Sequence, residues 1–376
     1  MESLTTQSLL ASHLGKSGIN HSFPLYQLKA LQKLSICRTA ALGGHAQYCQ
    51  AGHLNGVWYN SCKHRACPQC QGIARERWLK HTEALLLNCP HHHFIFTIPS
   101  SLHNLWRYNR ALMTNLLFKA TQKTLHTFSE NPRYLGAMPG VLAVLHTWGR
   151  NLSLHPHLHV LISHGGWHES QGWVAPKKKI LFPQKPLMMV FRGKLLALIR
   201  SALSNRQLTL PHECDAKQLS LLLYKLGRLP WVVHGCERYE NAIGVAKYLA
   251  RYVKGGPFHN RQLSRTKNNQ IHFRYRSHQT KRRERIHLSE QNFILRLVQH
   301  VPLPGKPMAR YAGLYSSACR LKLNEAREAL GQQPVTPSPQ LCWTDYLEEQ
   351  GYRPKCEVCG LPLIQGETKA PERPLQ

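Results

Sequence analysis

The chain has 376 residues, with 49 Lys and Arg against 19 Asp and Glu, so its formal net charge at pH 7 is +30. Its hydrophobic fraction of 42% is enough for folded domains and excludes a mainly disordered chain. No segment approaches the roughly 18 uninterrupted apolar residues of a membrane span. The N-terminus also lacks the basic-then-apolar order of a signal peptide. We therefore expect neither a membrane protein nor a secreted one.

The large positive charge predicts a polyanionic partner. A surface with this charge repels itself and attracts nucleic acid, which basic domains bind largely by neutralising phosphates. A merely soluble cationic surface is the alternative. Acidic residues are so scarce that we favour nucleic-acid binding.

Helix and strand patterns follow one another along the chain. Helical spacing of apolar residues predicts helices over 75–87, 101–129, 184–203, 241–253 and 289–299, and Ser289 is expected to cap the last of them. Short apolar runs predict strands over 92–99, 141–148, 157–163 and 231–235. The short polar turn between the second and third strands predicts an antiparallel pair. The order as a whole predicts an α+β fold, in which helices pack on a central antiparallel sheet.

Cysteines gather in the segment that precedes these elements. Four of them, Cys49, Cys62, Cys67 and Cys70, lie within 22 residues, with His45, His53 and His64 interleaved. In a chain without a secretion signal, such a cluster favours a metal site over disulfides. Structural zinc prefers a tetrahedron of thiolates and imidazoles. We expect these four thiolates to hold Zn²⁺, and reduced, unliganded cysteines are the alternative.

The sharpest local pattern is a His-x-His pair on a predicted strand. His157 and His159 would lie side by side, because side chains at i and i+2 share one face, while Leu158 and Val160 would pack on the other. Two neighbouring imidazoles on a strand are a common way to hold a divalent metal. A chain with 24 His can also contain such a pair by chance.

A pair of tyrosines follows on the predicted helix over 241–253. Tyr248 and Tyr252 are four residues apart and therefore share one helix face. Taken alone, the pair is more typical of an aromatic core. Three cations, Lys247, Arg251 and Lys254, border it and suit DNA phosphates.

Together these groups suit transesterification of DNA. A tyrosine oxygen would attack a backbone phosphate and become joined to it. A divalent ion held by two imidazoles, with nearby Lys and Arg, would neutralise the developing charge. Two tyrosines would allow two sequential cleavages, which suits moving a strand.

The motifs resemble the HUH endonuclease superfamily and, more narrowly, the ninety-one family of rolling-circle transposases of bacterial insertion sequences. The matching stretches are residues 61–71, 96–99, 146–148, 155–162, 248–252, 300–302 and 310–315. The resemblance covers roughly residues 25–320. It implies an HUH-like two-tyrosine nuclease domain over 79–260, preceded by a helical lead and zinc-binding domain over 1–78 and followed by a basic region with a Pro-rich tail over 261–376.

The resemblance implies that His157 and His159 bind Mg²⁺ or Mn²⁺ and that Tyr248 and Tyr252 are the nucleophiles. A third metal ligand would come from elsewhere, with His155 or His146 as candidates. It implies a cut in single-stranded DNA at an element end, a 5′-phosphotyrosine, a free 3′-hydroxyl and transfer to target DNA without ATP. It also implies a bacterial cytoplasmic protein associated with the nucleoid.

The zinc segment departs from the pattern of its relatives. They show a second Cys-x2-Cys upstream, whereas this chain has Cys49 followed by Gly52 and His53. The second cysteine is missing, so His53 or His45 is a candidate replacement ligand. Cys356 and Cys359 form half of another such site. Cys342 or Cys319 could complete it, and an exposed turn in the tail is the alternative.

The basic stretch over 261–285 is the remaining candidate DNA surface. Its candidate DNA-binding cations are Arg274, Arg276, Lys281, Arg282 and Arg283. Interleaved aromatics, Phe273 and Tyr275, suit single-stranded DNA because bases stack while phosphates are neutralised. A solvated strand face with a buried aromatic edge is the alternative.

Three other functions compete with a transposase. A rolling-circle replication initiator or conjugative relaxase would share the chemistry, but the zinc segment and the stretch over 300–315 favour a transposase. A non-catalytic zinc DNA-binding protein would use the His and Tyr pairs as core residues. An inactive relic of an element is also possible from sequence.

Overall fold

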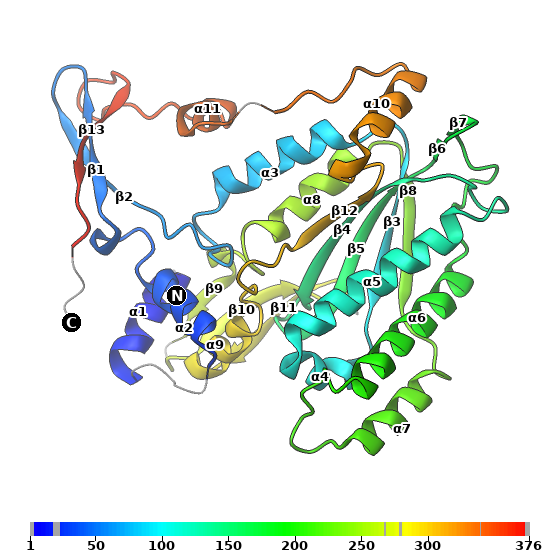
Figure 1. Cartoon of the computed structure of the whole chain (residues 1–376). Helices are drawn as coiled ribbons and strands as arrows, with labels where there is room; N and C mark the ends of the chain where they lie inside the picture. Colours follow the sequence, from blue (N-terminus) through cyan, green and yellow to red (C-terminus); the bar gives the residue numbers. More distant parts are fainter. Residues whose placement is uncertain (1–3, 18–22, 267, 278–279, 339, 373–376) are drawn as a thin grey trace.

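A five-stranded antiparallel sheet forms the centre of the computed structural model, which describes residues 4–17, 23–266, 268–277, 280–338 and 340–372. Its strand order is β12-β4-β5-β3-β8 (Figure 1). The strands are β3 (His91–Thr97), β4 (Gly140–Trp148), β5 (Leu154–Ser163), β8 (Val233–Tyr239) and β12 (Ala309–Gly313). The predicted α+β class is confirmed, and β5, which carries the His-x-His pair, is the middle strand.

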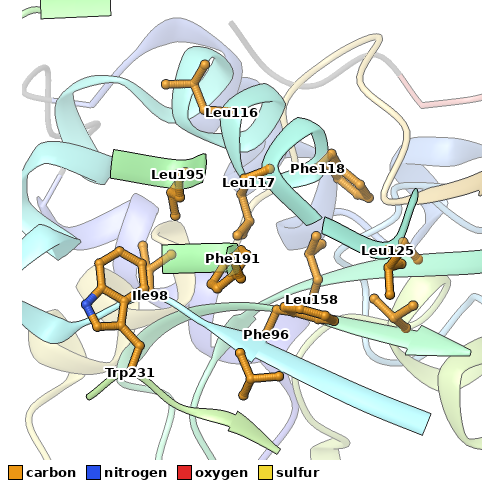
Figure 2. Close-up of a cluster of buried hydrophobic side chains, with 14 of the residues drawn as sticks. Phe96, Ile98, Leu116, Leu117, Phe118, Leu125, Leu158, Phe191, Leu195 and Trp231 are labelled. Carbon is orange, nitrogen blue, oxygen red and sulfur yellow. The ribbon is translucent and has the colours of Figure 1, made fainter. Parts of the chain in front are cut away.

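One face of the central sheet is covered by helices from the middle of the chain. They are α4 (His103–Tyr108), α5 (Arg110–Ser129), α6 (Gln184–Ser204) and α7 (Ala216–Leu226). Figure 2 shows Phe96 of β3 and Leu158 of β5 against Leu117 of α5 and Phe191 of α6, all of them buried. Burial of these side chains supplies the main hydrophobic stabilisation of this layer.

The opposite face is covered by α3 (Gly72–Leu85), α8 (Ile243–Val253) and α10 (Arg320–Ala329). Side chains alternate along the pleated strands, so Leu142 and Val144 of β4 pack here while Val141 and Ala143 pack under α5 and α6. The sheet is therefore the middle layer of three, and both of its faces are buried.

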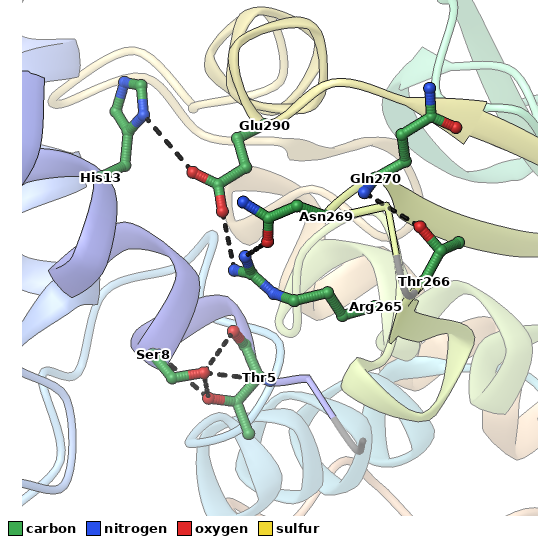
Figure 3. A network of polar contacts seen from close by, with 8 residues as sticks. All are labelled: Thr5, Ser8, His13, Arg265, Thr266, Asn269, Gln270 and Glu290. Carbon is green, nitrogen blue, oxygen red and sulfur yellow. Dashed lines mark hydrogen bonds and ion pairs between the residues drawn. The ribbon is translucent and has the colours of Figure 1, made fainter. Parts of the chain in front are cut away.

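A second core lies below the central sheet in Figure 1. It joins α1 (Thr6–Ser17), α2 (Leu25–Ser35) and α9 (Glu290–Val298) to a sheet of β9 (Leu263–Arg265), β10 (Ile271–Arg276) and β11 (Arg283–Leu288). The predicted cap of α9 is confirmed, because the Ser289 side chain accepts a hydrogen bond from the Asn292 amide at 3.2 Å. Figure 3 shows Glu290 between His13 of α1 and Arg265 of β9, at 4.0 Å and 2.7 Å.

A third unit is a small ribbon whose strands come from both ends of the chain. Strand β1 (Gly44–Cys49) lies between β2 (Leu54–Tyr59) and β13 (Leu363–Lys369). A chain segment with α11 (Trp343–Glu349) leads to β13 across α3 (Figure 1). The smaller elements are β6 (Gly166–His168), β7 (Gly172–Val174), η1 (Ala40–Leu42), η2 (Ser100–Leu102), η3 (Asn260–Gln262) and η4 (Ser317–Cys319).

The region after residue 260 does not lie apart from the rest. Its β12 pairs with β4 at the edge of the central sheet, and its β13 pairs with β1 in the ribbon. Pairing between segments far apart in the sequence leaves no local signal, so the expected boundary at residue 261 could not anticipate it. Within the described ranges, no helix is long and apolar enough to cross a membrane.

A pH dependence of stability follows from the buried His91. Its Nε2 lies 2.6 Å from the Tyr315 hydroxyl and its Nδ1 lies 2.8 Å from the Cys89 carbonyl oxygen. Burial lowers the pKa of His91 to about 4. In the unfolded chain the pKa of this imidazole is about 6.5. The stability that the neutral, buried His91 contributes is therefore fully present above pH 6.5 and is lost as the pH falls towards 4.

Between pH 7 and pH 4.5 the free energy of unfolding of both proteins should fall. We expect the fall in His91→Gln to be smaller than that in the wild type by about 2.5 kcal/mol. Urea unfolding followed by tryptophan fluorescence at both pH values measures the difference. Because other acid-sensitive groups are shared by the two proteins, their effects cancel in the comparison. Equal losses would show that His91 does not resist protonation in the fold.

Candidate active site and metal centres

Three histidines meet on the face of the central sheet that α8 covers. His157 and His159 project from β5, and His146 lies directly opposite His157 on β4. Their candidate ligand nitrogens all lie within 4.8 Å of one another. The same pleat sends Leu158 and Val160 to the opposite face, as the sequence predicted.

The hydrogen bonds of His157 fix which nitrogen it can offer to a metal. Its Nδ1 lies 2.6 Å from the His155 carbonyl oxygen, which can only accept, so Nδ1 donates and Nε2 presents its lone pair. This Nε2 lies 3.1 Å from Nε2 of His159. Two lone pairs at that distance repel unless a proton or a cation lies between them, so the pair suits a shared ion.

His93 of β3 supports His159 from the next strand. Its Nε2 lies 2.8 Å from Nδ1 of His159 and accepts a hydrogen bond in the tautomer that frees His159 Nε2. Burial lowers the pKa of His93 to about 4. Such a partner orients a ligating imidazole. His93 is not among the site residues predicted from the sequence, and its place in the run His91–His93 is the signal that could have suggested it.

His146 is the third member of the cluster and is fully buried. Its Nε2 has no hydrogen-bond partner in the described structure, which is unusual for a buried polar atom. Burial, followed by the neighbouring imidazoles, lowers the pKa of His146 and His159 well below the ordinary value. Both rings are therefore neutral at pH 7, the form that binds metals. Of the two candidate third ligands, the structure brings His146 to the site.

The other candidate, His155, is not within the cluster. The pairing of β4 with β5 shifts register after His146. The regular alternation of side chains is interrupted there, so His155 does not align with His157 and His159. Its ring lies 6.1 Å from that of His103 on α4 and 5.0 Å from that of His157. His155 contributes through its carbonyl, which orients His157.

Helix α8 places both tyrosines against the histidines. Its buried residues, among them Leu249 and Ala250, pack in the core that includes α3 and β4. The Tyr248 and Tyr252 rings are 4.9 Å apart, as expected for neighbours one turn apart. The ring centres of Tyr252 and His146 are 4.5 Å apart, and those of Tyr248 and His159 are 5.9 Å apart. The aromatic pair is thus part of the histidine site and not a closed core.

The three cations of α8 differ in exposure. Lys247 and Arg251 are exposed, whereas Lys254 is half-buried at the C-terminal end of the helix. Burial and then the charge of Arg65 lower the pKa of Lys254. Beyond it, Gly256 has φ +73°, and a Cβ there would lie 2.5 Å from the Ala66 carbonyl oxygen. The end of the tyrosine helix therefore rests against the cysteine segment.

The cysteine segment contains a four-sulfur cluster that differs from the expected one. Cys62, Cys67 and Cys70 are joined by Cys37, not by Cys49. The Sγ atoms of Cys62 and Cys70 are 3.7 Å apart, as are those of Cys37 and Cys67. Cys37 follows α2, whose packing against α9 and the sheet of β9, β10 and β11 (the basic sheet) brings it here. Cys37 was not predicted as a ligand because it stands alone in the sequence.

Cys49 lies instead in a second group with His53, Cys356 and Cys359. The half-site in the tail is therefore joined by the β1–β2 hairpin and not by Cys319 or Cys342. His45 belongs to neither group, and its ring lies 6.5 Å from Trp58.

The basic sheet presents cations on one face and buries aromatics on the other. Its exposed cations include Arg274, Arg276, Lys281, Arg282 and Arg283. Arg274 and Arg276 lie opposite Arg285 and Arg283 in the β10–β11 pairing. Phe273 is buried in the second core, so this ring is not available to stack on a base. Tyr275 is half-buried and donates to Glu284 at 2.7 Å.

His300 is a further buried residue that sequence reasoning left without a role. Its Nε2 donates to the Leu152 carbonyl at 3.1 Å, and its Nδ1 accepts from the Thr147 hydroxyl at the same distance. Thr147 lies near the end of β4, and Leu152 lies in the turn between β4 and β5. His300 therefore fixes the end of the hairpin that carries the three imidazoles, and its packing on Trp148 supports Tyr252.

Comparison with known proteins adds independent findings. A family model described as "Transposase zinc-binding domain" matches residues 9–98, and one described as "Putative transposase" matches residues 140–322. The "Putative transposase y4qJ" of Sinorhizobium fredii is 34% identical over 320 residues, which are 83% of this chain and 80% of that protein. The chain belongs to the IS91 family of transposases.

A second relative agrees with this assignment. The "Transposase for insertion sequence element IS801" of Pseudomonas savastanoi pv. phaseolicola is 29% identical over 354 residues, which are 90% of this chain and 83% of that protein. No solved structure matches the chain. The zinc-binding domain of this transposase contains the cluster of Cys37, Cys62, Cys67 and Cys70, while the histidines of β4 and β5 and the tyrosines of α8 lie in the second matched region.

We expect Cys37→Ser to remove about one bound zinc ion per chain, because the remaining thiolates cannot complete a tetrahedron. The substitution also places a hydroxyl in the second core, so thermal stability should fall. Metal analysis of the purified protein measures the zinc. Cys214→Ser, at a partly exposed cysteine outside both clusters, is the matched control and should retain all zinc. Full zinc content in Cys37→Ser would exclude Cys37 as a ligand.

Proposed function

We propose that this transposase cleaves single-stranded DNA at the ends of its insertion sequence by tyrosine transesterification and transfers the strand by a rolling-circle route. The supporting observation is the meeting of three buried imidazoles with two tyrosines at one point of the fold. These side chains come from β4, β5 and α8.

The donor set fits a catalytic divalent cation, for which we propose Mg²⁺ or Mn²⁺. His146, His157 and His159 would hold it, and the unpartnered Nε2 of His146 is the buried atom that such an ion would satisfy. When bound, the cation would polarise the scissile phosphate and neutralise charge that develops on it. His93 would keep His159 in the tautomer that presents Nε2.

The proposed first step uses a tyrosine oxygen as the nucleophile. The phenol loses its proton to water, its oxygen forms a bond to phosphorus, and the bond from phosphorus to the 3′-oxygen breaks. The freed 3′-oxygen takes up a proton. In the second step a 3′-hydroxyl attacks the phosphotyrosine and releases the phenol. The number of phosphate ester bonds is conserved, so no nucleotide cofactor is required.

The different surroundings of the two tyrosines suggest an order. Tyr248 is 41% exposed and can meet incoming DNA, whereas Tyr252 is packed between His146 and Trp148. We therefore propose that Tyr248 makes the first attack and that Tyr252 serves the second. Lys247 and Arg251 lie exposed on the same helix and would hold the flanking phosphates.

The basic sheet would extend the DNA-binding surface. Arginines directly opposite one another on β10 and β11 repel, and this arrangement becomes favourable when a polyanion lies across them. The sheet also abuts the catalytic hairpin, because Arg150 beside the β4–β5 turn donates to the Arg276 carbonyl at 3.1 Å. DNA that crosses the basic sheet would thus lead toward the tyrosines.

A covalent-adduct assay tests the chemistry. Single-stranded DNA from an element end is labelled at its 3′ or 5′ end, incubated with the protein and Mg²⁺ or Mn²⁺, and run on a denaturing gel. We expect a protein-linked band from the 3′-labelled strand only, together with an extendable 3′-hydroxyl on the 5′-labelled fragment. Tyr248→Phe should reduce the first adduct at least tenfold, and the double change with Tyr252→Phe should abolish it.

Two controls separate chemistry from folding. Tyr275→Phe, in the basic sheet, should retain the adduct, while His157→Ala with His159→Ala should lose it and still bind DNA. If bound DNA gives no adduct with the wild type, the non-catalytic alternative holds. A band from the 5′-labelled strand would contradict the proposed polarity.

The salt dependence of binding tests the basic sheet. We expect Arg274→Gln with Arg276→Gln to reduce the slope of log K against log salt by about 0.7 for each lost phosphate contact on single-stranded DNA. Fluorescence anisotropy at several salt concentrations measures it. The matched control is Lys185→Gln with Lys217→Gln. It removes two exposed cations from α6 and α7, which cover the face of the central sheet opposite to α8. An equal change in both variants would show only a general charge effect.

A further inference from the structure

The ribbon at the edge of the molecule contains a group of four potential metal ligands. Cys49 and His53 flank the turn between β1 and β2, and Cys356 and Cys359 precede β13. Their ligand atoms lie within 4.8 Å of one another. The matched zinc-binding domain ends at residue 98, so the tail cysteines lie far outside it.

The distances fit a tetrahedral zinc ion. The Sγ atoms of Cys49 and Cys359 are 3.5 Å apart, and Nδ1 of His53 lies 3.4 Å from Sγ of Cys49 and 3.9 Å from Sγ of Cys356. Bonds of about 2.3 Å to sulfur and 2.0–2.1 Å to nitrogen give tetrahedral edges of about 3.5–3.8 Å. A disulfide would require sulfurs about 2.05 Å apart.

The backbone forms a tight turn beside each pair of ligands. Gly52 has φ +78° and donates to the Cys49 carbonyl at 2.9 Å, and Gly360 has φ +72° and donates to the Cys356 carbonyl at 2.9 Å. The Val358 amide lies 3.4 Å from Sγ of Cys356 and stabilises a thiolate there. Both glycines adopt the left-handed backbone that such turns need.

The ribbon has little else to stabilise it. Strand β13 is largely exposed and β2 is at most half-buried, and no described residue of β1, β2 or β13 belongs to the three hydrophobic clusters. Small units without a core usually need a metal or another cross-link. Strand pairing places Leu363 of β13 opposite Cys49 of β1.

We propose that Cys49, His53, Cys356 and Cys359 bind a second structural zinc ion, which fastens the C-terminal strand β13 to the N-terminal ribbon. Four protein ligands leave no position for water, so the site is structural and not catalytic. The ion closes a loop that contains the whole catalytic sheet, and it holds α11 across α3. This proposal does not depend on the strand-transfer chemistry.

Zinc counting on the full-length protein tests the proposal. We expect two zinc ions per chain in the wild type, one in Cys356→Ser/Cys359→Ser and none when Cys37→Ser is added. The control pair Cys319→Ser and Cys342→Ser removes the two cysteines nearest in sequence to the tail site and should retain both ions. A retained second ion in Cys356→Ser/Cys359→Ser overturns the proposal.

Hydrogen exchange locates the effect of the lost ion. In Cys356→Ser/Cys359→Ser, amides of residues 363–369 and 44–49 should exchange at least tenfold faster, while those of β4 and β5 should not change. His53→Cys should keep the zinc and the protection, and His53→Ala should lose both. Faster exchange throughout β4 and β5 would overturn a local fastening role, as would unchanged exchange in the ribbon.

Discussion

Because side chains alternate along β4 and β5, each of these strands serves two layers at once. One set of residues, including Leu158 and Val160, is buried under α5 and α6. The other set includes His146, His157 and His159 and faces α8. A shift of register by one residue would exchange the two sets and would bury the imidazoles in an apolar layer. Burial of both faces therefore fixes the positions of the three imidazoles.

The tyrosine helix depends on the same packing. Leu249 and Ala250 bury one side of α8, and this leaves Tyr248 and Tyr252 directed at the histidines. At its end, the close approach of Gly256 to Ala66 connects the helix to the zinc-binding domain. The Cys37 cluster thus supports the position of the two tyrosines as well as the fold of its own segment.

The two cysteine groups differ in what surrounds them. The Cys37 cluster lies within the second core, where α1, α2, α9 and the basic sheet also pack. The Cys49 group lies in a ribbon outside the hydrophobic clusters of the described residues. Metal would supplement packing in the first case and would replace it in the second. That difference explains why loss of the second ion should remain local.

The sequence by itself determined the features that depend on short spacing. The His-x-His pair on a strand, the Tyr pair on a helix, the Ser289 cap and the antiparallel β4–β5 hairpin follow from periods of about two and 3.6 residues. The tertiary structure alone decided the partners from distant segments. The register of β4 and β5 places His146 beside His157 and His159. Tertiary packing brings Cys37 to the first cluster and places Cys49 with the tail cysteines. It also buried Phe273, because pairing and packing, which no local period encodes, set which face of β10 meets the core.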